Sequence, residues 1–171
     1  MYTAHLDHHG ICAPGQPDPI CNGAIDDATG IAEMLEIARG FVALRDRART
    51  VVFIATTGEE RGLRGAQWFA HHPTIPPAQI VAIWFARVGV PSATLWQGFT
   101  DAAGSKSRGE AAFREFRKNR YHQPGDGWSA TYDWEGAAQM ARTQLLIGVS
   151  LLDGPPPQWK PGAPFKRRAR N

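Results

Sequence analysis

Histidine and carboxylate residues occur in four groups along this chain, each beside an expected strand end, helix start or turn. The groups are His5 with Asp7, Asp26 with Asp27, Glu59 with Glu60, and His122. Imidazole nitrogens and carboxylate oxygens together form a ligand set that Zn²⁺ accepts in open, catalytic sites. The four groups therefore predict a zinc site, provided that the fold brings them together.

The spacing within two of the groups indicates how their residues could divide the chemistry. In a strand, the side chains of His5 and Asp7 point to the same face, so one can bind a metal while the other supports it. Glu59 and Glu60 would point to opposite sides of an extended chain, so one could bind the metal while the other acts as a general base on the bound water. Taken singly, each group could equally be a surface pair, a helix cap or solvated charge.

Hydrophobic patterning predicts an alternation of strands and helices that would position these groups. Apolar runs predict strands over residues 2–6, 51–56, 80–90 and 91–97. Helices are predicted from Asp26 or Asp27 to residue 44, in the segment that stops at Pro73, and over residues 110–120 and 132–152. This alternation is typical of an α/β fold, in which ligands bind at the carboxyl ends of the strands.

Length and composition exclude several classes of protein. The chain has 171 residues, of which 43% are hydrophobic and 20% are charged, and its net charge is +3. These values fit one ordinary soluble domain and argue against intrinsic disorder. No apolar stretch is long enough for a membrane span, and the start lacks the features of a signal peptide, so we expect neither.

Basic residues and cysteines leave alternatives open. Basic residues cluster at 45–49, 114–120 and 166–170. Charge alone would allow a nucleic-acid partner, but no binding motif accompanies the charge, so we expect a solvated basic surface and no nucleic-acid partner. Cys12 and Cys21 flank a loop of turn-forming residues, and they could pair in an oxidising compartment or remain free.

Four segments of the sequence resemble the co-catalytic di-zinc aminopeptidases of metallopeptidase family twenty-eight. They are HLDHHG, NGAIDDATGIAEMLEIA, RTVVFIATTGEERGLRGAQWFA and NRYHQPGD, which begin at residues 5, 22, 49 and 119. The spaced set HxD, GAxDDATG and GEExGLxGA is specific. The resemblance implies a three-layer α/β sandwich with a mixed, mostly parallel sheet, a peptide substrate, and hydrolysis of N-terminal peptide bonds with zinc as the cofactor.

The resemblance also implies roles for individual residues. Asp26 matches the aspartate that bridges two zinc ions. His5 matches a ligand of one ion, and Glu60 and His122 match ligands of the other. Glu59 matches the general base that takes a proton from the bridging water.

Supporting roles follow from the same resemblance. Asp7 matches the carboxylate that orients the imidazole of His5. Asp27 is expected to cap the following helix rather than to bind metal. His8 and His9 fall in a loop that varies within the family, and we expect neither to be a ligand. Family members are often exported, which would favour a disulfide between Cys12 and Cys21, although localisation stays undetermined.

The sequence departs from the family pattern after the third predicted strand. The family has an aspartate there that completes the zinc site of His5 and Asp26, whereas no Asp, Asn or Glu lies between Ile80 and Asp101. We expect an internal deletion near Ile83 to Phe85 and a truncated N-terminus. Residues 1–171 would then form a single, partial peptidase domain, with a Pro-rich basic tail at 154–171.

Two functions therefore stand at this point. The first is a zinc-dependent metallopeptidase of the aminopeptidase type, with Glu59 as general base and one zinc held more firmly than the other. The alternative is a non-catalytic remnant of such a peptidase that binds at most one zinc firmly, because one ligand is missing.

Overall fold

The sheet that positions the predicted groups consists of two parallel strands. The structure is a computed structural model that describes residues 1–44, 47–76, 79–82, 95, 98–100, 103–158 and 161–162. Strand β1 (Tyr2–His5) pairs in parallel with β4 (Phe53–Thr56), in a register that sets Tyr2 opposite Phe53 and His5 opposite Thr56. The strands predicted over 2–6 and 51–56 are therefore present, and the α/β class is confirmed.

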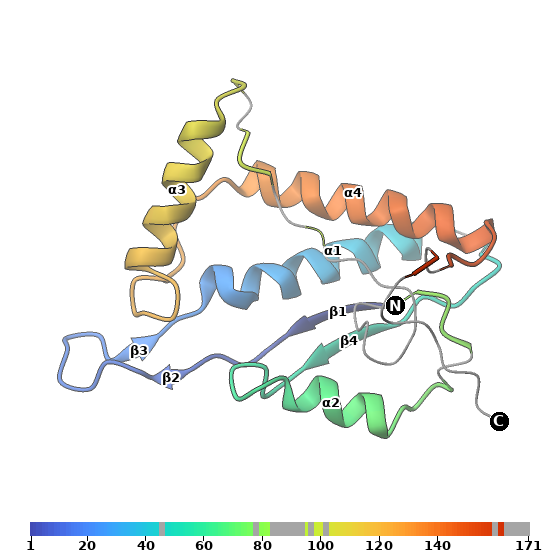
Figure 1. Ribbon diagram of the computed structural model, residues 1–171, viewed down its shortest axis with the longest axis horizontal. Coiled ribbons are helices and arrows are strands. Elements are labelled where there is room, and N and C mark those ends of the chain that lie inside the picture. The colour runs from blue at the N-terminus through green and yellow to red at the C-terminus, as the bar shows by residue number, and fades with distance from the viewer. Residues whose placement is uncertain are drawn as a thin grey trace.

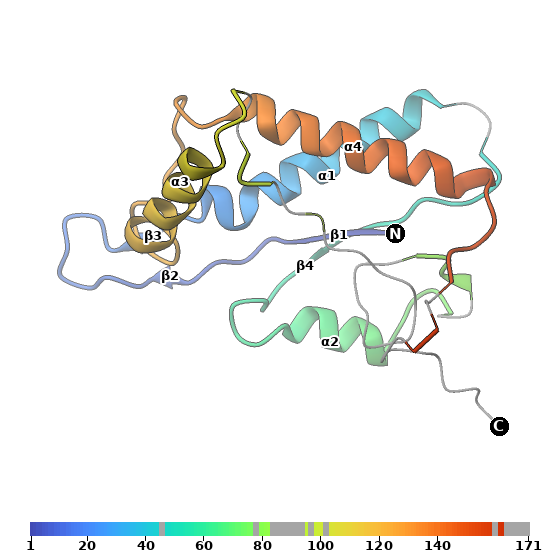
Figure 2. The ribbon, with the colours of Figure 1, turned by 45° about the horizontal axis from the view of Figure 1, so that its top comes forward.

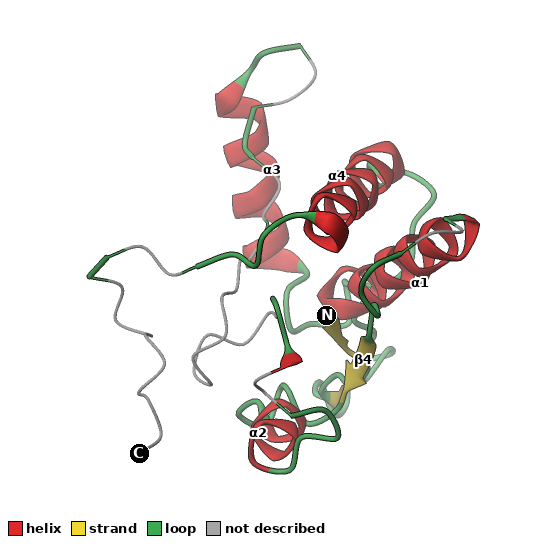
Figure 3. Cartoon of the chain, turned by 90° about the vertical axis from the view of Figure 1, so that its right-hand side faces the viewer, coloured by secondary structure: helices red, strands yellow, loops and turns green. Residues whose placement is uncertain are grey.

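Helices lie on both sides of this sheet. Helices α1 (Thr29–Ala43) and α4 (Trp134–Asp153) run side by side on one face, and α2 (Arg64–His71) lies on the other (Figures 1 and 3). Helix α3 (Lys106–Asn119) stands at the end of the molecule toward which β1 points (Figure 1). The helices predicted over 110–120 and 132–152 are thus present, and α3 begins earlier than expected.

The main apolar core joins α1, α4 and the sheet. Its buried members are Ile37, Phe41, Ala141 and Leu152. Tyr2 and Phe53 pack against them from the two strands. A side-chain carbon at Gly148 of α4 would meet the hydroxyl of Tyr2 and the ring of Phe41, so a glycine is needed for this close approach. On the opposite face, Phe69 of α2 packs against Met1, Ile54 and Ile80.

The segment before α1 is irregular, although the sequence predicts helix from Asp26 or Asp27. Residues Ala24–Ala28 form a turn, η1, in which Asp26 (φ −114°, ψ 85°) and Asp27 (φ −136°, ψ 31°) are not helical. The regular helix begins at Thr29. The predicted start is therefore wrong by two or three residues, because the backbone at Asp26 and Asp27 is not helical.

A disulfide-closed hairpin follows β1 where the sequence predicts only a loop. Strands β2 (Gly10–Ile11) and β3 (Ile20–Cys21) pair antiparallel, and Cys12 is bonded to Cys21. Asn22 Nδ2 donates a hydrogen bond of 2.8 Å to the carbonyl of Pro124, which fixes the hairpin beside the turn after α3 (Figure 2).

Several expectations fall on residues that the structure leaves undescribed. The predicted strands over 80–90 and 91–97 lie mostly outside the described residues, and the described residues 80–82 and Leu95 are not in a strand. The deletion expected near Ile83 to Phe85 and most of the tail at 154–171 also lie outside them. Among the described helices, none combines the length and the apolar character needed to cross a membrane.

Candidate metal centre

The fold brings the four predicted groups to one place. Because β1 and β4 are parallel, their carboxyl ends lie at the same edge of the sheet, and Asp7 and the Glu59–Glu60 pair follow those ends. Turn η1 brings Asp26 to the same edge, and the turn after α3 adds His122. Residues that are 117 positions apart, His5 and His122, thus face the same aspartate.

Asp26 lies between the two predicted histidine ligands. Its Oδ1 is 3.2 Å from Nε2 of His5, and its Oδ2 is 3.2 Å from Nε2 of His122. Each carboxylate oxygen therefore faces a different imidazole. This is the arrangement that a carboxylate shared between two metal positions requires.

Glu60 is surrounded by three imidazoles. Its Oε1 lies 2.7 Å from Nδ1 of His8, and its Oε2 lies 3.1 Å from Nε2 of His9 and 3.3 Å from Nε2 of His122. The side chain of Glu60 is only 4% exposed. The sequence assigns no ligand role to His8 or His9, yet both lie against the carboxylate that it identifies as a ligand.

Buried polar atoms in this cluster lack hydrogen-bond partners. Within the described part of the chain, the unpartnered atoms are both ring nitrogens of His8, Nε2 of His9, Nε2 of His122 and Oε1 of Glu60. Buried polar groups are nearly always bonded in proteins, so such a concentration is unusual. The distances above are close approaches without hydrogen-bond geometry, which suits atoms that share a cation.

The spacing of these atoms fits zinc. Two nitrogen or oxygen ligands at the usual zinc distances subtend a tetrahedral edge of about 3.3 Å. The distances from His122 Nε2 to Asp26 Oδ2 and to Glu60 Oε2 are 3.2 Å and 3.3 Å. Two triads have ligand atoms within 4.8 Å of one another, namely His9, Glu60, His122 and His8, Asp26, Glu60. The residues present therefore fit a bound zinc ion.

Further carboxylates hold the backbone of the ligand segments. Asp7 accepts hydrogen bonds from the backbone N–H groups of Glu59 (3.1 Å) and Glu60 (3.4 Å). Asp27 accepts from the backbone N–H of His5 at 3.0 Å. Because Nδ1 of His5 lies 3.0 Å from the backbone carbonyl oxygen of Asp7 and 3.8 Å from its carboxylate, the carbonyl is the nearer orienting group.

Asp126 is a functional residue that the sequence reasoning missed. It is fully buried, and its carboxylate accepts hydrogen bonds from the backbone N–H groups of Ile25 (3.1 Å) and Asp26 (3.1 Å). It thereby fixes turn η1 from a position 100 residues away. The only sequence signal was its place in the YHQPGDG turn with His122.

When no metal is bound, the charges in the site favour a protonated His5 and an ionised Asp26. Burial lowers the pKa of His5, but its hydrogen bond with Asp26 and the charge of Asp27 outweigh burial and raise the pKa to about 9. Burial acts to raise the pKa of Asp26, but the neighbouring histidines lower it overall. Burial raises the pKa of Asp126.

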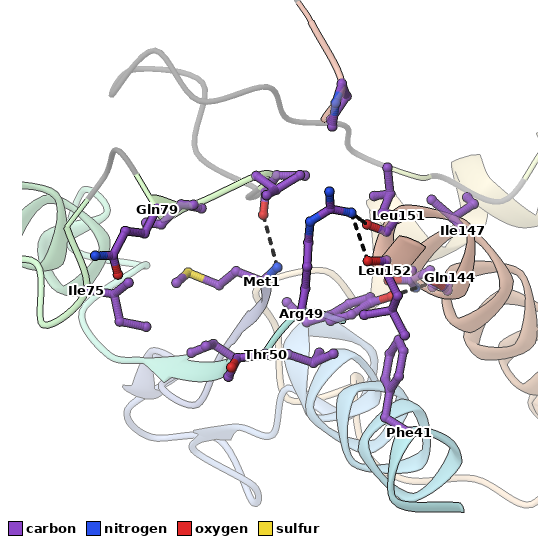
Figure 4. A pocket seen from close by; sticks show the side chains of 18 of the residues that line it. Met1, Phe41, Arg49, Thr50, Ile75, Gln79, Gln144, Ile147, Leu151 and Leu152 are labelled. Atoms are coloured by element: carbon purple, nitrogen blue, oxygen red, sulfur yellow. Dashed lines mark hydrogen bonds between the residues drawn. The ribbon is translucent and has the colours of Figure 1, made fainter. Parts of the chain in front are cut away.

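Two cavities lie at opposite ends of the sheet. A cavity of about 410 Å³ adjoins His122 and is bounded by the disulfide hairpin and Pro124. A larger, mainly apolar cavity of about 760 Å³ surrounds Met1 and the start of β1 (Figure 4). His122 lines the smaller cavity, and none of the residues in the cluster lines the larger one.

Comparisons with known proteins agree with the residue pattern. Residues 1–84 match the family model of peptidase family M28. The chain is 56% identical over 45 residues to a probable zinc metalloprotease of Pyrenophora teres f. teres, a match that covers 26% of this chain and 10% of that protein. It is 38% identical over 71 residues to a vacuolar membrane protease of Candida dubliniensis, covering 42% of this chain and 7% of that protein.

A longer match is weaker in identity. The chain is 30% identical over 114 residues to a vacuolar membrane protease of Candida glabrata, which covers 60% of this chain and 12% of that protein. The chain thus spans 7–12% of the length of these three relatives. No solved structure matches the chain significantly.

Proposed function

Since residues 1–84 match the family model of peptidase family M28, we propose that this chain is a zinc-dependent metallopeptidase that removes N-terminal residues from peptides. The observation that supports the proposal most directly is the set of buried, unpartnered imidazole and carboxylate atoms at the carboxyl ends of β1 and β4. In this proposal the two strands belong to a three-layer sandwich of which residues 1–171 form one domain, with a basic tail at 154–171.

The proposed zinc ligands are the residues that converge on Asp26 and Glu60. His5 and His122 approach the two oxygens of Asp26, and Glu60 lies beside His122. Zinc bound there would polarise the scissile carbonyl and lower the pKa of an attacking water.

Glu59 is the proposed general base. It immediately precedes Glu60, and its backbone N–H is held by Asp7, so its position relative to the ligands is fixed. Its carboxylate would accept a proton from the attacking water and deliver that proton to the leaving amine. A general base contributes a factor of about 10²–10⁴ to such a reaction.

An aminopeptidase specificity fits the charge of the site. Five carboxylates gather at one edge of the sheet, those of Asp7, Asp26, Asp27, Glu59 and Glu60. Such a concentration of negative charge attracts the protonated amino terminus of a peptide. The cavity beside His122 offers room for the first side chain of the substrate.

A second candidate function rests on one specific observation. No Asp, Asn or Glu lies between Ile80 and Asp101, where the family pattern has its remaining acidic ligand. With that ligand absent, the chain would be a non-catalytic protein that holds at most one zinc ion firmly.

Hydrolysis assays with zinc distinguish the two. We expect the zinc-loaded protein to cleave aminoacyl p-nitroanilides, and Glu59→Gln to lower kcat by about 10²–10⁴ without loss of bound zinc. Glu36→Gln is the matched control, since Glu36 is exposed on α1 and paired with Arg39. Equal rates for the wild type and Glu59→Gln would reject the catalytic role. Absence of hydrolysis, with one zinc or fewer retained after dialysis, would favour the second candidate.

A further inference from the structure

The proposed function leaves two histidines with buried ring nitrogen atoms without a role, namely His8 and His9. His8 and His9 directly follow the HxD motif, and they precede the disulfide hairpin. We propose that both are zinc ligands, His9 in a triad with Glu60 and His122, and His8 in a triad with Asp26 and Glu60. The inference rests on the proposed zinc site but adds ligands that the family resemblance does not supply.

The geometry around Glu60 divides the imidazoles between its two oxygens, with His8 at Oε1 and with His9 and His122 at Oε2. The ring nitrogens of His8, His9 and His122 approach its two oxygens at 2.7, 3.1 and 3.3 Å. The rings themselves are close, since the centroids of His9 and His122 are 4.2 Å apart and those of His8 and His9 are 5.0 Å apart. Three imidazoles around one carboxylate form a nitrogen-rich set that suits zinc.

Burial makes these atoms costly to leave without a partner. The side chains of His8 and Glu60 are 10% and 4% exposed, and neither ring nitrogen of His8 makes a hydrogen bond within the described chain. An unpaired polar group in such a place destabilises the folded chain, because it has lost its hydrogen bonds to water. A metal ion would satisfy the imidazole and the carboxylate together.

The backbone around His8 is shaped to admit its ring. Gly23 has φ +68°, and a side-chain carbon added there would come within 2.7 Å of Cγ and 2.9 Å of Cδ2 of His8. Any residue other than glycine would therefore push the His8 ring away from Glu60. Gly23 also directly precedes turn η1, which presents Asp26. Gly23 thus leaves space for the His8 ring, and it directly precedes the turn that contains Asp26, a proposed ligand.

The family pattern includes an acidic zinc ligand that this sequence lacks, and the proposal changes how the remaining ligands are divided between the two metal positions. With no acidic residue between Ile80 and Asp101, an arrangement based on His5, Asp26, Glu60 and His122 has only two imidazoles for two metal positions. His8 adds a nitrogen donor within reach of Asp26 and Glu60, and His9 adds one within reach of Glu60 and His122. The position at Glu60 would then hold zinc more firmly than the position of His5 and Asp26, to which the missing aspartate belongs.

Zinc affinity and metal spectroscopy test the proposal. We would measure zinc binding to the full chain by competition with a chromophoric chelator, for the wild type, His8→Gln and His9→Gln. His71→Gln is the matched control, because His71 is an exposed histidine near the end of α2. We expect each test substitution to weaken zinc binding by about tenfold or more, and the control to leave binding unchanged.

A second experiment counts the zinc ligands in the wild-type protein, so its result does not depend on whether the variants fold. X-ray absorption of the wild-type protein loaded with one zinc should show at least two imidazole ligands, and Co²⁺ in the same site should give the visible bands of a tetrahedral ion. At most one imidazole per zinc, or unchanged affinity in both test variants, would overturn the proposal.

The outcomes also separate this proposal from the proposed function. Hydrolysis and zinc binding that survive in both variants would overturn the ligand role of His8 and His9 alone. Zinc that depends on His8 and His9, in a protein without hydrolysis, would support their ligand role and reject the peptidase. A wild-type protein that binds no zinc would reject both, and the cluster would then be a set of ion pairs between Glu60 and protonated histidines.

Discussion

Replacing Asp126 by alanine should damage the metal site from outside its ligands. The Asp126 carboxylate is fully buried and accepts the backbone N–H groups of Ile25 and Asp26 at 3.1 Å each. Its backbone carbonyl also accepts the N–H of Ala24 at 2.8 Å, a bond that the substitution retains. The change therefore removes two hydrogen bonds to turn η1, at Ile25 and Asp26, and retains the bond at Ala24.

The magnitude follows from those two bonds. A buried N–H left without an acceptor costs about 1–3 kcal/mol, so two of them cost about 2–6 kcal/mol. Removing a buried charge returns part of that energy, since burial disfavours the ionised form of Asp126 and raises its pKa. We expect the free energy of unfolding to fall by about 2–3 kcal/mol. Because Asp26 loses its anchor, zinc affinity should fall about 10–100-fold.

Urea unfolding followed by circular dichroism would measure the first effect, and chelator competition the second. Asp133→Ala is the matched control, because Asp133 also accepts a backbone N–H, that of Gly136 at 2.9 Å, but does so at the exposed start of α4. This control should lose about 1 kcal/mol of stability and no zinc affinity. A variant at position 126 with wild-type zinc affinity would refute the reasoning, whatever its stability.

Two further predictions concern the core rather than the site. Arg49 donates hydrogen bonds from Nη1 to the last carbonyl groups of α4, including that of Gly154 at 2.8 Å, so Arg49→Ala should lower the free energy of unfolding by about 1–2 kcal/mol in urea. Arg39→Ala, at an exposed pair on α1, should change it by less than about 0.5 kcal/mol, and equal losses would contradict the capping role. Burial raises the pKa of Tyr2 to about 12 from an unfolded value of 10.0. The stability that Tyr2 contributes is therefore complete below pH 10 and is lost as the pH rises from 10 through 12. Unfolding at several alkaline pH values should show a flatter decline for Tyr2→Phe, and parallel curves would argue against this shift.

Elements with long hydrophobic periodicity could be predicted from the sequence alone. Strands β1 and β4 and helix α4 lie within one or two residues of their predicted bounds. In each case, the pattern of apolar residues reflects local burial, which depends on neighbours in sequence. The match of residues 1–84 to peptidase family M28 likewise followed from motifs that are contiguous in the chain.

Elements held by distant partners could not be predicted in the same way. Strands β2 and β3 have two residues each, too short for any periodic signal, and a disulfide closes them. The predicted start of α1 is too early in the chain, because acidic residues usually favour the first turn of a helix and Asp26 and Asp27 precede the helix here. Here Asp27 accepts the backbone N–H of His5, a residue in another element, as well as that of Gly30 in the first turn of α1.

In the candidate site, too, some residues could be predicted from the sequence and others depend on contacts between distant segments. Residue types identified His5, Asp26, Glu60 and His122, and the fold brings all four together. The approach of His8 and His9 to Glu60 depends on how the chain turns after β1, which the residue types do not encode.

The carboxylates of this site fall into two kinds, and the difference explains how the chain can hold the site together without metal. Asp26 and Glu60 face imidazoles, whereas Asp7, Asp27 and Asp126 accept backbone N–H groups of the segments that bear the ligands. Each of these three supports comes from a different segment than the one it holds. The backbone bonds satisfy part of the negative charge, so the supports need no cation. The proposed ligand carboxylates, in contrast, meet the rings of His8, His9 and His122, which have nitrogen atoms that stay unpartnered among the described residues. The negative charge that no backbone N–H group satisfies is therefore concentrated on Asp26 and Glu60, the two residues that a metal would bind. The backbone bonds fix the positions of both residues before a metal ion binds.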